Sequence, residues 1–434
     1  MDHVRSLVAR HFGATGGELL VGGIPVSALA REHGTPLFLY DAQVLDRQFA
    51  LLRKIYPDEF AISYSVKANP CPAVVRHFLN LGLGLEIASA GEFHQALCAG
   101  CVPERILFAG PGKTEAELQF VLGRGIGEIH VESLREAHRV STISESLGIR
   151  ARVALRVNPG AEVQGGAMRM GGKPAPFGVD EERLDAVLDH LVDDAHIQFQ
   201  GIHLFTGTQI LDADVLVAQY RRGIEIARRV ADRIGRSLRT VDFGGGLGIP
   251  YFPNEAPLPI DRLGASLAPL VSEIRADARF HDTQLLIEPG RYLVGEAGIY
   301  VTRVNDIKES RGKTFLILDG GMNHHLAASG NLGQVIKRNF PAALVNRLDD
   351  PQAATFDVVG PLCTPLDVLA RDIVLPTAQV GDLFGIFQSG AYARTASPLG
   401  FLSQPTPAEV FVRDGAAILA RRRGTYDDAL KDVP

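Results

Sequence analysis

Short apolar segments alternate with helical ones from about residue 60 to residue 290, and this alternation constrains the fold more than any other feature. Parallel strands need long crossover connections, usually helices, so the rhythm predicts parallel βαβ units. Eight such units in about 230 residues predict an α/β fold that closes as a (β/α)8 barrel, the TIM barrel. The predicted strands are Phe60–Val66, Gly84–Ala88, Arg105–Ala109, Glu128–Glu132, Arg152–Val157, Gln200–Phe205, Arg239–Phe243 and Gln284–Glu288.

The pattern changes after residue 290, where strands follow one another with few long helices between them. This is typical of a mainly antiparallel sheet. The strands expected there are Ile299–Asn305, Thr314–Asp319, Phe356–Val359, Leu383–Gln388, Glu409–Val412 and Ala417–Arg421. Two short N-terminal strands, Glu18–Val21 and Pro36–Tyr40, are expected to join them. We therefore predict a barrel domain over residues 46–290 and a second, mainly antiparallel β-domain built from residues 1–45 and 291–434.

Composition and charge exclude several classes of protein. The chain has 434 residues, enough for two domains, and 44 Lys and Arg against 50 Asp and Glu give a net charge of −6 at pH 7. This balance argues against a broad nucleic-acid-binding surface. No stretch reaches the ~18 apolar residues of a membrane span, and Met1–Arg5 lacks the start of a signal peptide. We expect a cytoplasmic protein that binds neither nucleic acid nor membrane.

Two motifs suggest other chemistry but have structural explanations. Cys98 and Cys101 form a C-x-x-C pair, yet no second pair exists to complete a zinc site, and the motif follows a helical stretch instead of starting one. Gly110–Thr114 resembles a P-loop, but the glycine required at position 107 is a leucine. Thr114 and Glu117 instead fit a capping box at the start of the next helix. We predict no metal site.

Polar residues gather just after the predicted strands, where the active site of a (β/α)8 barrel lies. Lys67 follows the apolar strand that begins at Phe60. A lysine at this place would be partly buried, which lowers its pKa, and a low-pKa amine can form a Schiff base with a carbonyl substrate or with pyridoxal phosphate. The alternative is a structural lysine whose amine reaches solvent at the barrel rim.

Two glycine-rich loops follow the seventh and eighth strands, where barrels often bind phosphate. Asp242–Gly248 contains three consecutive glycines, which expose backbone N–H groups to an anion. Glu288–Tyr292 offers a buried carboxylate, a glycine and a guanidinium. A phosphate would suit Gly290 and Arg291, and Glu288 could hold a proton on a pyridine nitrogen.

Taken together, these motifs resemble the fold type III pyridoxal-phosphate decarboxylases, the group of diaminopimelate, ornithine and arginine decarboxylases. The resemblance covers nearly the whole chain, and the motifs occur in the family's order. Two polar clusters of the second domain, Gly360–Asp367 and Ser389–Tyr392, belong to it, although each alone would be ordinary packing. The resemblance implies pyridoxal 5'-phosphate as cofactor, a small amino-acid substrate and a homodimer with shared active sites.

The resemblance also implies a role for each matching residue. Lys67 matches the Schiff-base lysine, Glu288 the partner of the pyridine nitrogen, and Cys363 the residue that a second subunit donates to protonate the product. The phosphate ligands would be Thr208, Gly245, Gly246, Gly290, Arg291 and Tyr392. The residues beside the cofactor ring would be Phe205 and His203. Those near the substrate would be Thr364, Asp367, Arg156 and His325, and Glu86 matches a charged position beside the lysine.

Three departures from the family bear on the substrate. The ring-stacking histidine is Phe205 here, which can stack but cannot donate a hydrogen bond, and His203 points the same way along the strand. The acidic residue that binds a substrate's distal amine is Thr364, which removes a contact worth ~1.5–3 kcal/mol. The Arg-Pro pair of diaminopimelate decarboxylases is replaced by His324-His325. Adjacent residues of a strand face opposite ways, so we expect no metal pair there.

These departures favour a subgroup that includes decarboxylases of aminoacyl groups tethered to carrier proteins and the exosortase-associated decarboxylases. We expect pyridoxal-phosphate-dependent decarboxylation of an amino acid or of a carrier-tethered aminoacyl group. The alternatives are diaminopimelate decarboxylase proper, an amino-acid racemase on the same architecture, and a non-catalytic binder. Glu288 disfavours the racemase, which tends to place Arg at the ring nitrogen. The presence of both Lys67 and Cys363 disfavours the binder.

Overall fold

The computed structural model describes residues 2–160, 168–169, 174–205 and 207–434. It divides the chain into two compact units. The barrel unit comprises Ala50–Ile249 and Pro257–Gly290, and the β-unit comprises Met1–Phe49, Pro250–Ala256 and Arg291–Pro434. The short segment Pro250–Ala256 lay inside the predicted barrel domain, whereas the structure groups it with the β-unit.

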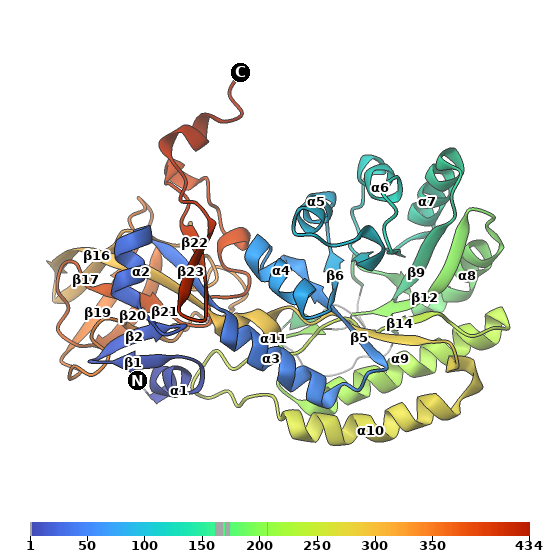
Figure 1. Cartoon of the computed structure of the whole chain (residues 1–434), viewed down its shortest axis with the longest axis horizontal. Helices are drawn as coiled ribbons and strands as arrows, with labels where there is room; N and C mark the ends of the chain where they lie inside the picture. Colours follow the sequence, from blue (N-terminus) through green and yellow to red (C-terminus); the bar gives the residue numbers. More distant parts are fainter. Residues whose placement is uncertain (1, 161–167, 170–173, 206) are drawn as a thin grey trace. The chain divides into compact units, whose positions relative to one another are not determined.

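Eight parallel strands form the barrel among the described residues (Figure 1). They are β5 (Phe60–Ser65), β6 (Gly84–Ile87), β7 (Ile106–Phe108), β8 (Glu128–Val131), β9 (Ala151–Asn158), β12 (Ile197–Leu204), β14 (Thr240–Asp242) and β15 (Gln284–Ile287). The ring is closed because β15 pairs with β5 and β8 pairs with β9. The predicted TIM barrel is thus confirmed, with every predicted strand in place.

Amphipathic helices connect these strands. In α9 (Ala213–Ile234), the buried residues Leu216, Tyr220, Ile224, Ala227 and Ala231 recur every three or four positions and form one apolar stripe. The others are α4 (Pro72–Asn80), α5 (Ala90–Cys98), α6 (Glu115–Leu122), α7 (Leu134–Leu147), α8 (Leu184–Asp193) and α10 (Ile260–Ala276), while α3 (Ala42–Ile55) spans the boundary between the units. None of the described helices is both long and apolar enough to cross a membrane.

The two motifs with structural explanations have the expected local structure. The Thr114 hydroxyl accepts a hydrogen bond from the Glu117 amide, and the Glu117 carboxylate accepts one from the Thr114 amide, so the predicted capping box is present at the start of α6. Cys98 and Cys101 are both free thiols. Burial raises the pKa of Cys101 to about 11, which keeps it a thiol at neutral pH.

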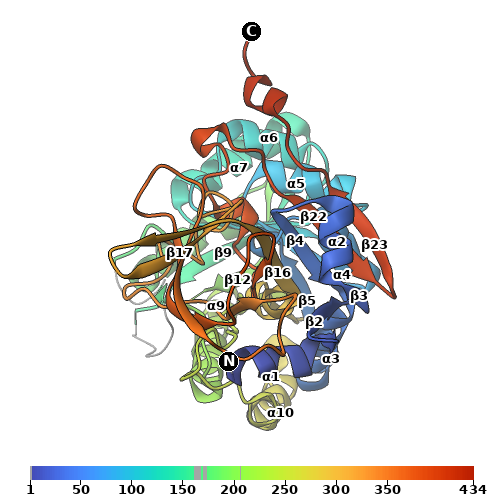
Figure 2. The same ribbon diagram turned by 90° about the vertical axis from the view of Figure 1, so that its left-hand side faces the viewer.

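The β-unit is built around the long strand β16 (Gly298–Ser310), which pairs antiparallel with β4 (Leu37–Asp41), β17 (Lys313–Leu318) and β21 (Leu383–Ile386). β4 lies between β16 and β22 (Figure 2). The remaining strands of this sheet are β18 (Ala342–Leu344), β19 (Ala354–Val359), β20 (Val368–Leu375), β22 (Ala408–Arg413) and β23 (Ala416–Arg421). The mainly antiparallel sheet is confirmed; β4–β22 and β17–β19 are its parallel pairs among the described residues.

Three details of the β-unit differ from the sequence expectation. β18 and β20 were not predicted, and Arg371-Asp372 interrupts the apolar character of β20. Glu18–Val21 is a strand, β2, but it pairs with β1 (Gly13–Thr15) and β3 (Ile24–Pro25) in a separate small sheet. The α-helices that lie wholly within the described part of the unit are α1 (Asp2–His11), α2 (Val26–His33) and α11 (Arg291–Val294).

Alternate side chains of neighbouring strands build the core of the β-unit, as the pleat of a sheet requires. One apolar cluster takes every second residue from three strands, namely Leu37, Leu39, Ile299, Val301, Val410 and Val412. The aromatic residues that alternate with them on β4 and β16 are also buried; they are Phe38, Tyr40 and Tyr300. Phe38 packs against Tyr300 with ring centroids 4.7 Å apart. Both faces of this part of the sheet are therefore covered.

Candidate active site

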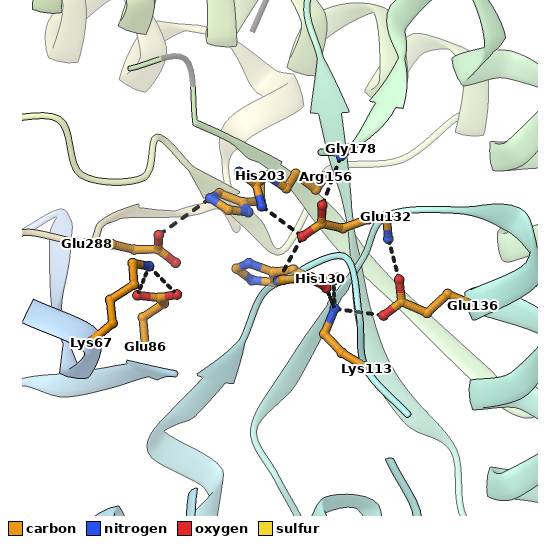
Figure 3. A network of polar contacts seen from close by, with 11 residues as sticks. Lys67, Glu86, Lys113, His130, Glu132, Glu136, Arg156, Gly178, His203 and Glu288 are labelled. Carbon is orange, nitrogen blue, oxygen red and sulfur yellow. Dashed lines mark hydrogen bonds and ion pairs between the residues drawn. The ribbon is translucent and has the colours of Figure 1, made fainter. Parts of the chain in front are cut away.

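The amine of Lys67 lies directly beyond the end of β5, on a short 3-10 turn formed by Val66–Ala68. Its Nζ donates to both carboxylate oxygens of Glu86, at 2.8 and 2.7 Å (Figure 3). Glu86 lies on the neighbouring strand β6, where it pairs in register with Ser65, whose hydroxyl also donates to it. The Lys67 side chain is 40% exposed and that of Glu86 is 1% exposed. The lysine side chain is thus more exposed than predicted, and a buried carboxylate fixes the direction of its amine.

A second polar group lies inside the same barrel (Figure 3). The Glu288 carboxylate, just after β15, approaches Nε2 of His203 at 3.4 Å. His203 comes from β12, and its ring lies 4.6 Å from the ring of His130 on β8. Asp242, at the end of β14, pairs in register with His203 and joins the group. All four side chains are buried.

Burial and mutual contact shift the pKa values of this group. Burial lowers the pKa of His203 to about 4, so its imidazole is neutral at neutral pH. Burial and the nearby Glu288 charge raise the pKa of Asp242 well above its ordinary value. Burial alone would raise the pKa of Glu288 too, but contact with His203 and the charge of Lys67 lower it below its usual range. Glu288 therefore remains the anion of the group.

Arg156 is held by a buried carboxylate on the other side of the barrel mouth (Figure 3). It donates to Glu132 at 2.7 Å, and Glu132 also accepts backbone N–H bonds from Gly110 and Gly178. Burial alone would raise the pKa of Glu132, but Arg156 and Lys113 lower it, so the carboxylate stays charged. The Arg156 guanidinium lies 5.9 Å from the ring of Phe205, which directly follows β12.

The glycines of the two loops stand where no side chain fits. A Cβ at Gly245 would lie 2.6 Å from the Glu288 carbonyl oxygen, and one at Gly290 would lie 2.9 Å from Cβ of Ala68. Gly246 has φ +102°, a conformation that L-residues rarely adopt. The backbones of both loops therefore pack closely against Glu288 and the lysine turn, where only glycine fits. Thr208 lies in β13 (Gly207–Thr208), which pairs with β10 (Met168–Arg169).

The β-unit holds the other predicted ligands. The Arg291 guanidinium donates to the Tyr251 hydroxyl at 2.9 Å and lies 4.7 Å from the ring of Tyr392. Its Nε is buried and has no hydrogen-bond partner among the described residues, so it can still donate to an anion. Tyr392 has φ +51°, a strained value for a non-glycine residue that places its ring beside the arginine.

Four predicted site residues lie in the Cys363 and His325 regions. Two of them are at least partly exposed to solvent and two are buried. Cys363 is exposed and Thr364 is half-buried. The Asp367 carboxylate is buried and accepts backbone N–H bonds from Met322 and Leu362. His325 is fully buried, with Nε2 2.9 Å from the Ser389 hydroxyl, and burial lowers its pKa to about 3.

The expectation that His324 and His325 lie on a strand is wrong, because they lie in turns after β17, where both amides donate to the Gly321 carbonyl. Their rings nevertheless have different polar partners, Tyr300 for His324 and Ser389 for His325.

Sequence reasoning missed three members of the polar groups: Asp242, His130 and Glu132. Each is a polar residue in or just after a barrel strand that also contains buried apolar residues. Such a residue faces either the barrel interior or a helix, and only an interior position marks it as a candidate site residue. These polar residues were visible in the sequence, but the strand register is needed to tell which of them face the barrel interior.

The residues present fit a pyridoxal phosphate group. A lysine amine, a buried anionic carboxylate and bare glycine loops occur together in the barrel unit, and a guanidinium with an unpartnered Nε follows directly in sequence. These are the groups such a cofactor needs for a Schiff base, a ring-nitrogen partner and a phosphate site.

Comparison with known proteins agrees with this fit. Residues 42–295 match the family described as "Pyridoxal-dependent decarboxylase, pyridoxal binding domain". The L-glutamyl-[BtrI acyl-carrier protein] decarboxylase of Niallia circulans is 38% identical, over 93% of this chain and 94% of that protein. A diaminopimelate decarboxylase of Methanothermobacter thermautotrophicus is 36% identical, over 96% and 95%.

A solved structure is similar over the same extent. It is the diaminopimelate decarboxylase of Helicobacter pylori complexed with L-lysine, which superposes with a TM-score of 0.81 at 28% identity and covers 93% of this chain and 98% of its own. The sequence resemblance, the closed barrel and these matches lead to one assignment: the chain belongs to the family of pyridoxal-phosphate-dependent decarboxylases and is a carboxy-lyase with pyridoxal phosphate as its cofactor.

Proposed function

We propose that this enzyme decarboxylates an aminoacyl group, with a glutamyl group tethered to a carrier protein as the first candidate and a free amino acid as the second. The observation that carries the decarboxylase chemistry is the barrel interior, where the Lys67 amine and the Glu288 anion are held by separate buried partners. The identity of 38% to a glutamyl-carrier-protein decarboxylase supports the substrate class.

Each group in the barrel unit has a proposed task. Lys67 would hold the cofactor covalently through its amine, which Glu86 orients. Glu288 would hold the proton of the pyridine nitrogen. Bound pyridoxal phosphate then supplies an electron sink for the bond that breaks when CO₂ leaves. The residues proposed to hold the phosphate are Thr208, Gly245, Gly246, Gly290, Arg291 and Tyr392.

Phe205, and not His203, is proposed to lie against the cofactor ring. The His203 side chain is committed to Glu288 and to the ring of His130, and only 1% of the residue is exposed. Phe205 comes two positions later, and a Cβ at Gly244 would touch its ring at 2.8 Å, so it packs on the glycine loop. Arg156 beside it offers a cation near the substrate's carboxylate.

The polar residues around Cys363 favour a substrate without a distal cation. Thr364 replaces a carboxylate, and the next acidic residue, Asp367, uses its oxygens to hold the backbone of Met322 and Leu362. We therefore assign Asp367 to loop structure, and His325, which is enclosed, to packing. A lysine-like or diaminopimelate-like amine would find no free carboxylate from these residues.

Cys363 is proposed to return a proton to Cα of the product. Its thiol is exposed in the β-unit, as a residue donated to another subunit would be. We therefore propose a homodimer with shared active sites, working in the cytoplasm.

The test of the function is CO₂ release from the purified enzyme with pyridoxal phosphate. Glutamyl-carrier protein, free glutamate, diaminopimelate and lysine are compared at equal concentration. The proposal expects release from the glutamyl substrates, and at least about tenfold less from the diamino acids, the factor for one lost charge-assisted contact. Lys67→Ala must lose both the release and the visible absorbance of the bound cofactor. Release from diaminopimelate alone would overturn the substrate assignment, and inversion of configuration without CO₂ would favour a racemase.

A further inference from the structure

We infer that Asp242 is a neutral carboxylic acid that donates a hydrogen bond to Glu288, and that Asp242 and His203 together are positioning residues for the Glu288 anion. This inference rests on the proposed role of Glu288 at the ring nitrogen. It assigns a role to Asp242 that could not be inferred from the net charge of the chain or from the glycines that follow this residue.

The geometry places two carboxyl groups and two imidazoles in one closed space. One ligand-type atom from each of His130, His203, Asp242 and Glu288 lies within 4.8 Å of all the others. The exposed fraction is 0% for His130 and Asp242, 1% for His203 and 5% for Glu288. Water therefore cannot solvate two negative charges here, and two carboxylates so close together cannot both be ionised.

The hydrogen bonds of Asp242 leave one oxygen without a donor. Oδ1 accepts the Gly244 amide at 2.7 Å. Oδ2 is buried and has no hydrogen-bond partner among the described residues, and the same is true of Oε1 of Glu288. A single proton on Oδ2 of Asp242 satisfies both atoms, because it is covalently bound to one and donated to the other.

The surrounding charges decide which carboxyl keeps that proton. Glu288 faces His203 at 3.4 Å and the Lys67 ammonium, both of which favour its anion. Asp242 instead faces the negative charges of Glu288 and Glu128, which favour its neutral form. Of the other charged groups, Arg156 is paired with Glu132, and Glu86 is paired with Lys67. The directions of the pKa shifts agree with this arrangement.

His130 closes the inner end of the group. Its Nε2 lies 3.1 Å from Glu128, which also accepts from the Thr240 hydroxyl. A proton on this nitrogen serves Glu128. When His203 carries its own proton on Nε2, 3.4 Å from Glu288, the Glu288 carboxylate has a donor on each side and is held as the acceptor.

The experiment is infrared spectroscopy of the full-length protein freed of cofactor, at neutral pH. The inference expects the carbonyl stretch of a protonated aspartate, which ¹³C labelling of aspartate separates from the stretch of the Glu92 acid. This aspartate band should be absent from Asp242→Asn and retained in the matched control Glu128→Gln. Labelling aspartate with ¹³C in the unsubstituted protein must shift the same band, so the result does not depend on a variant that folds. No such band, or a band lost only in Glu288→Gln, would overturn the inference, as would a stoichiometric metal ion in the purified protein.

A second measurement tests the positioning role. Asparagine keeps a donor and an acceptor at position 242, whereas alanine keeps neither. The cofactor dissociation constant should therefore rise at least about tenfold more in Asp242→Ala than in Asp242→Asn, the factor for one charge-assisted hydrogen bond. Equal weakening by both variants would contradict the role. Because the infrared band needs neither cofactor nor substrate, its presence in a protein that releases no CO₂ would refute the proposed function alone.

Discussion

At the scale of single residues, carboxyl groups at the barrel mouth lie close to one another in pairs and are partly removed from water. Glu86 holds the Lys67 amine, and Glu92 on the following helix feels the Glu86 charge. Burial, together with that charge, raises the pKa of Glu92 to about 7, against the opposing effect of the Ala88 amide that donates to it. An ionisable group with such a pKa titrates within the working range of an enzyme.

The raised pKa of Glu92 makes a prediction for stability against pH. The folded protein binds this proton more tightly than the unfolded chain between pH 4.5 and about 7, so the free energy of unfolding falls as pH rises through that window. Glu92→Gln removes the titration and keeps an acceptor for Ala88. The variant should gain about 1–2 kcal/mol over the parent above pH 7 and nothing near pH 4. Urea unfolding at the two pH values measures it; a gain that is equal at both would contradict the assignment.

A second residue-scale prediction concerns the glycine next to the lysine turn. In Gly290→Ala, the added Cβ would meet Cβ of Ala68 at 2.9 Å and Cβ of Ser65 at 3.1 Å. Either the loop or the lysine turn must move, and overpacking of this kind costs about 1–3 kcal/mol. We expect lower thermal stability and weaker cofactor binding. Gly112→Ala is the control, because its Cβ would meet nothing within 4 Å, and a comparable loss there would show that the crowding argument fails.

At the scale of elements, buried ion pairs fasten the loops to the strands. Lys113, in the loop after β7, donates to the carbonyls of Gly110 and His130 and to Glu136 at the start of α7. Glu136 in turn accepts the Glu132 amide, which fixes the residue that holds Arg156 (Figure 3). One lysine thus joins a loop, a strand and a helix behind the active site.

This arrangement predicts strong coupling between Lys113 and Glu136. Their side chains are 1% and 2% exposed, so Lys113→Met would leave a buried carboxylate without its partner and cost about 3–5 kcal/mol of unfolding free energy. In the background of Glu136→Gln, the same substitution should cost much less, because no buried charge remains. A double-mutant cycle by chemical denaturation measures the coupling. Additive losses would mean that the pair contributes little.

Much of the element scale could be predicted from sequence. The eight barrel strands were visible because buried parallel strands are continuous apolar runs, and the Thr114 capping box because capping is local. β20 was not predicted because its charged residues Arg371 and Asp372 interrupt the apolar pattern, and β18 was not predicted because it is short. The turn at His324-His325 was not predicted because two adjacent residues are too few to show a strand or helix periodicity.

At the scale of the whole molecule, each unit is assembled from distant parts of the chain. The β-unit takes β4 from the N-terminal region and pairs it with both β16 and β22, so its sheet forms only when the chain ends come together. Cys363, which the shared-site proposal takes from a second subunit, lies in this β-unit.

The proposed shared site predicts complementation between inactive variants. Lys67→Ala and Cys363→Ala should each lose most activity as pure proteins. If a second subunit donates Cys363, unfolding and refolding an equal mixture gives mixed dimers with one complete site, and about a quarter of the parent activity should return. Activity is measured as CO₂ release, with each variant refolded alone as the control. A mixture that stays inactive while a dimer is seen by sedimentation would exclude the shared site.

The sequence by itself determined the barrel, the second β-domain, the cofactor chemistry and the positions of Lys67 and Glu288, because strand periodicity and motif order are local properties of a chain. Only the tertiary structure decided which side chains face one another. Asp242, His203 and His130 lie far apart in sequence, yet strand register and burial turn them into one proton-sharing group around Glu288. It also showed that Asp367 and His325 are enclosed, because burial is set by packing from all directions and no stretch of sequence contains it.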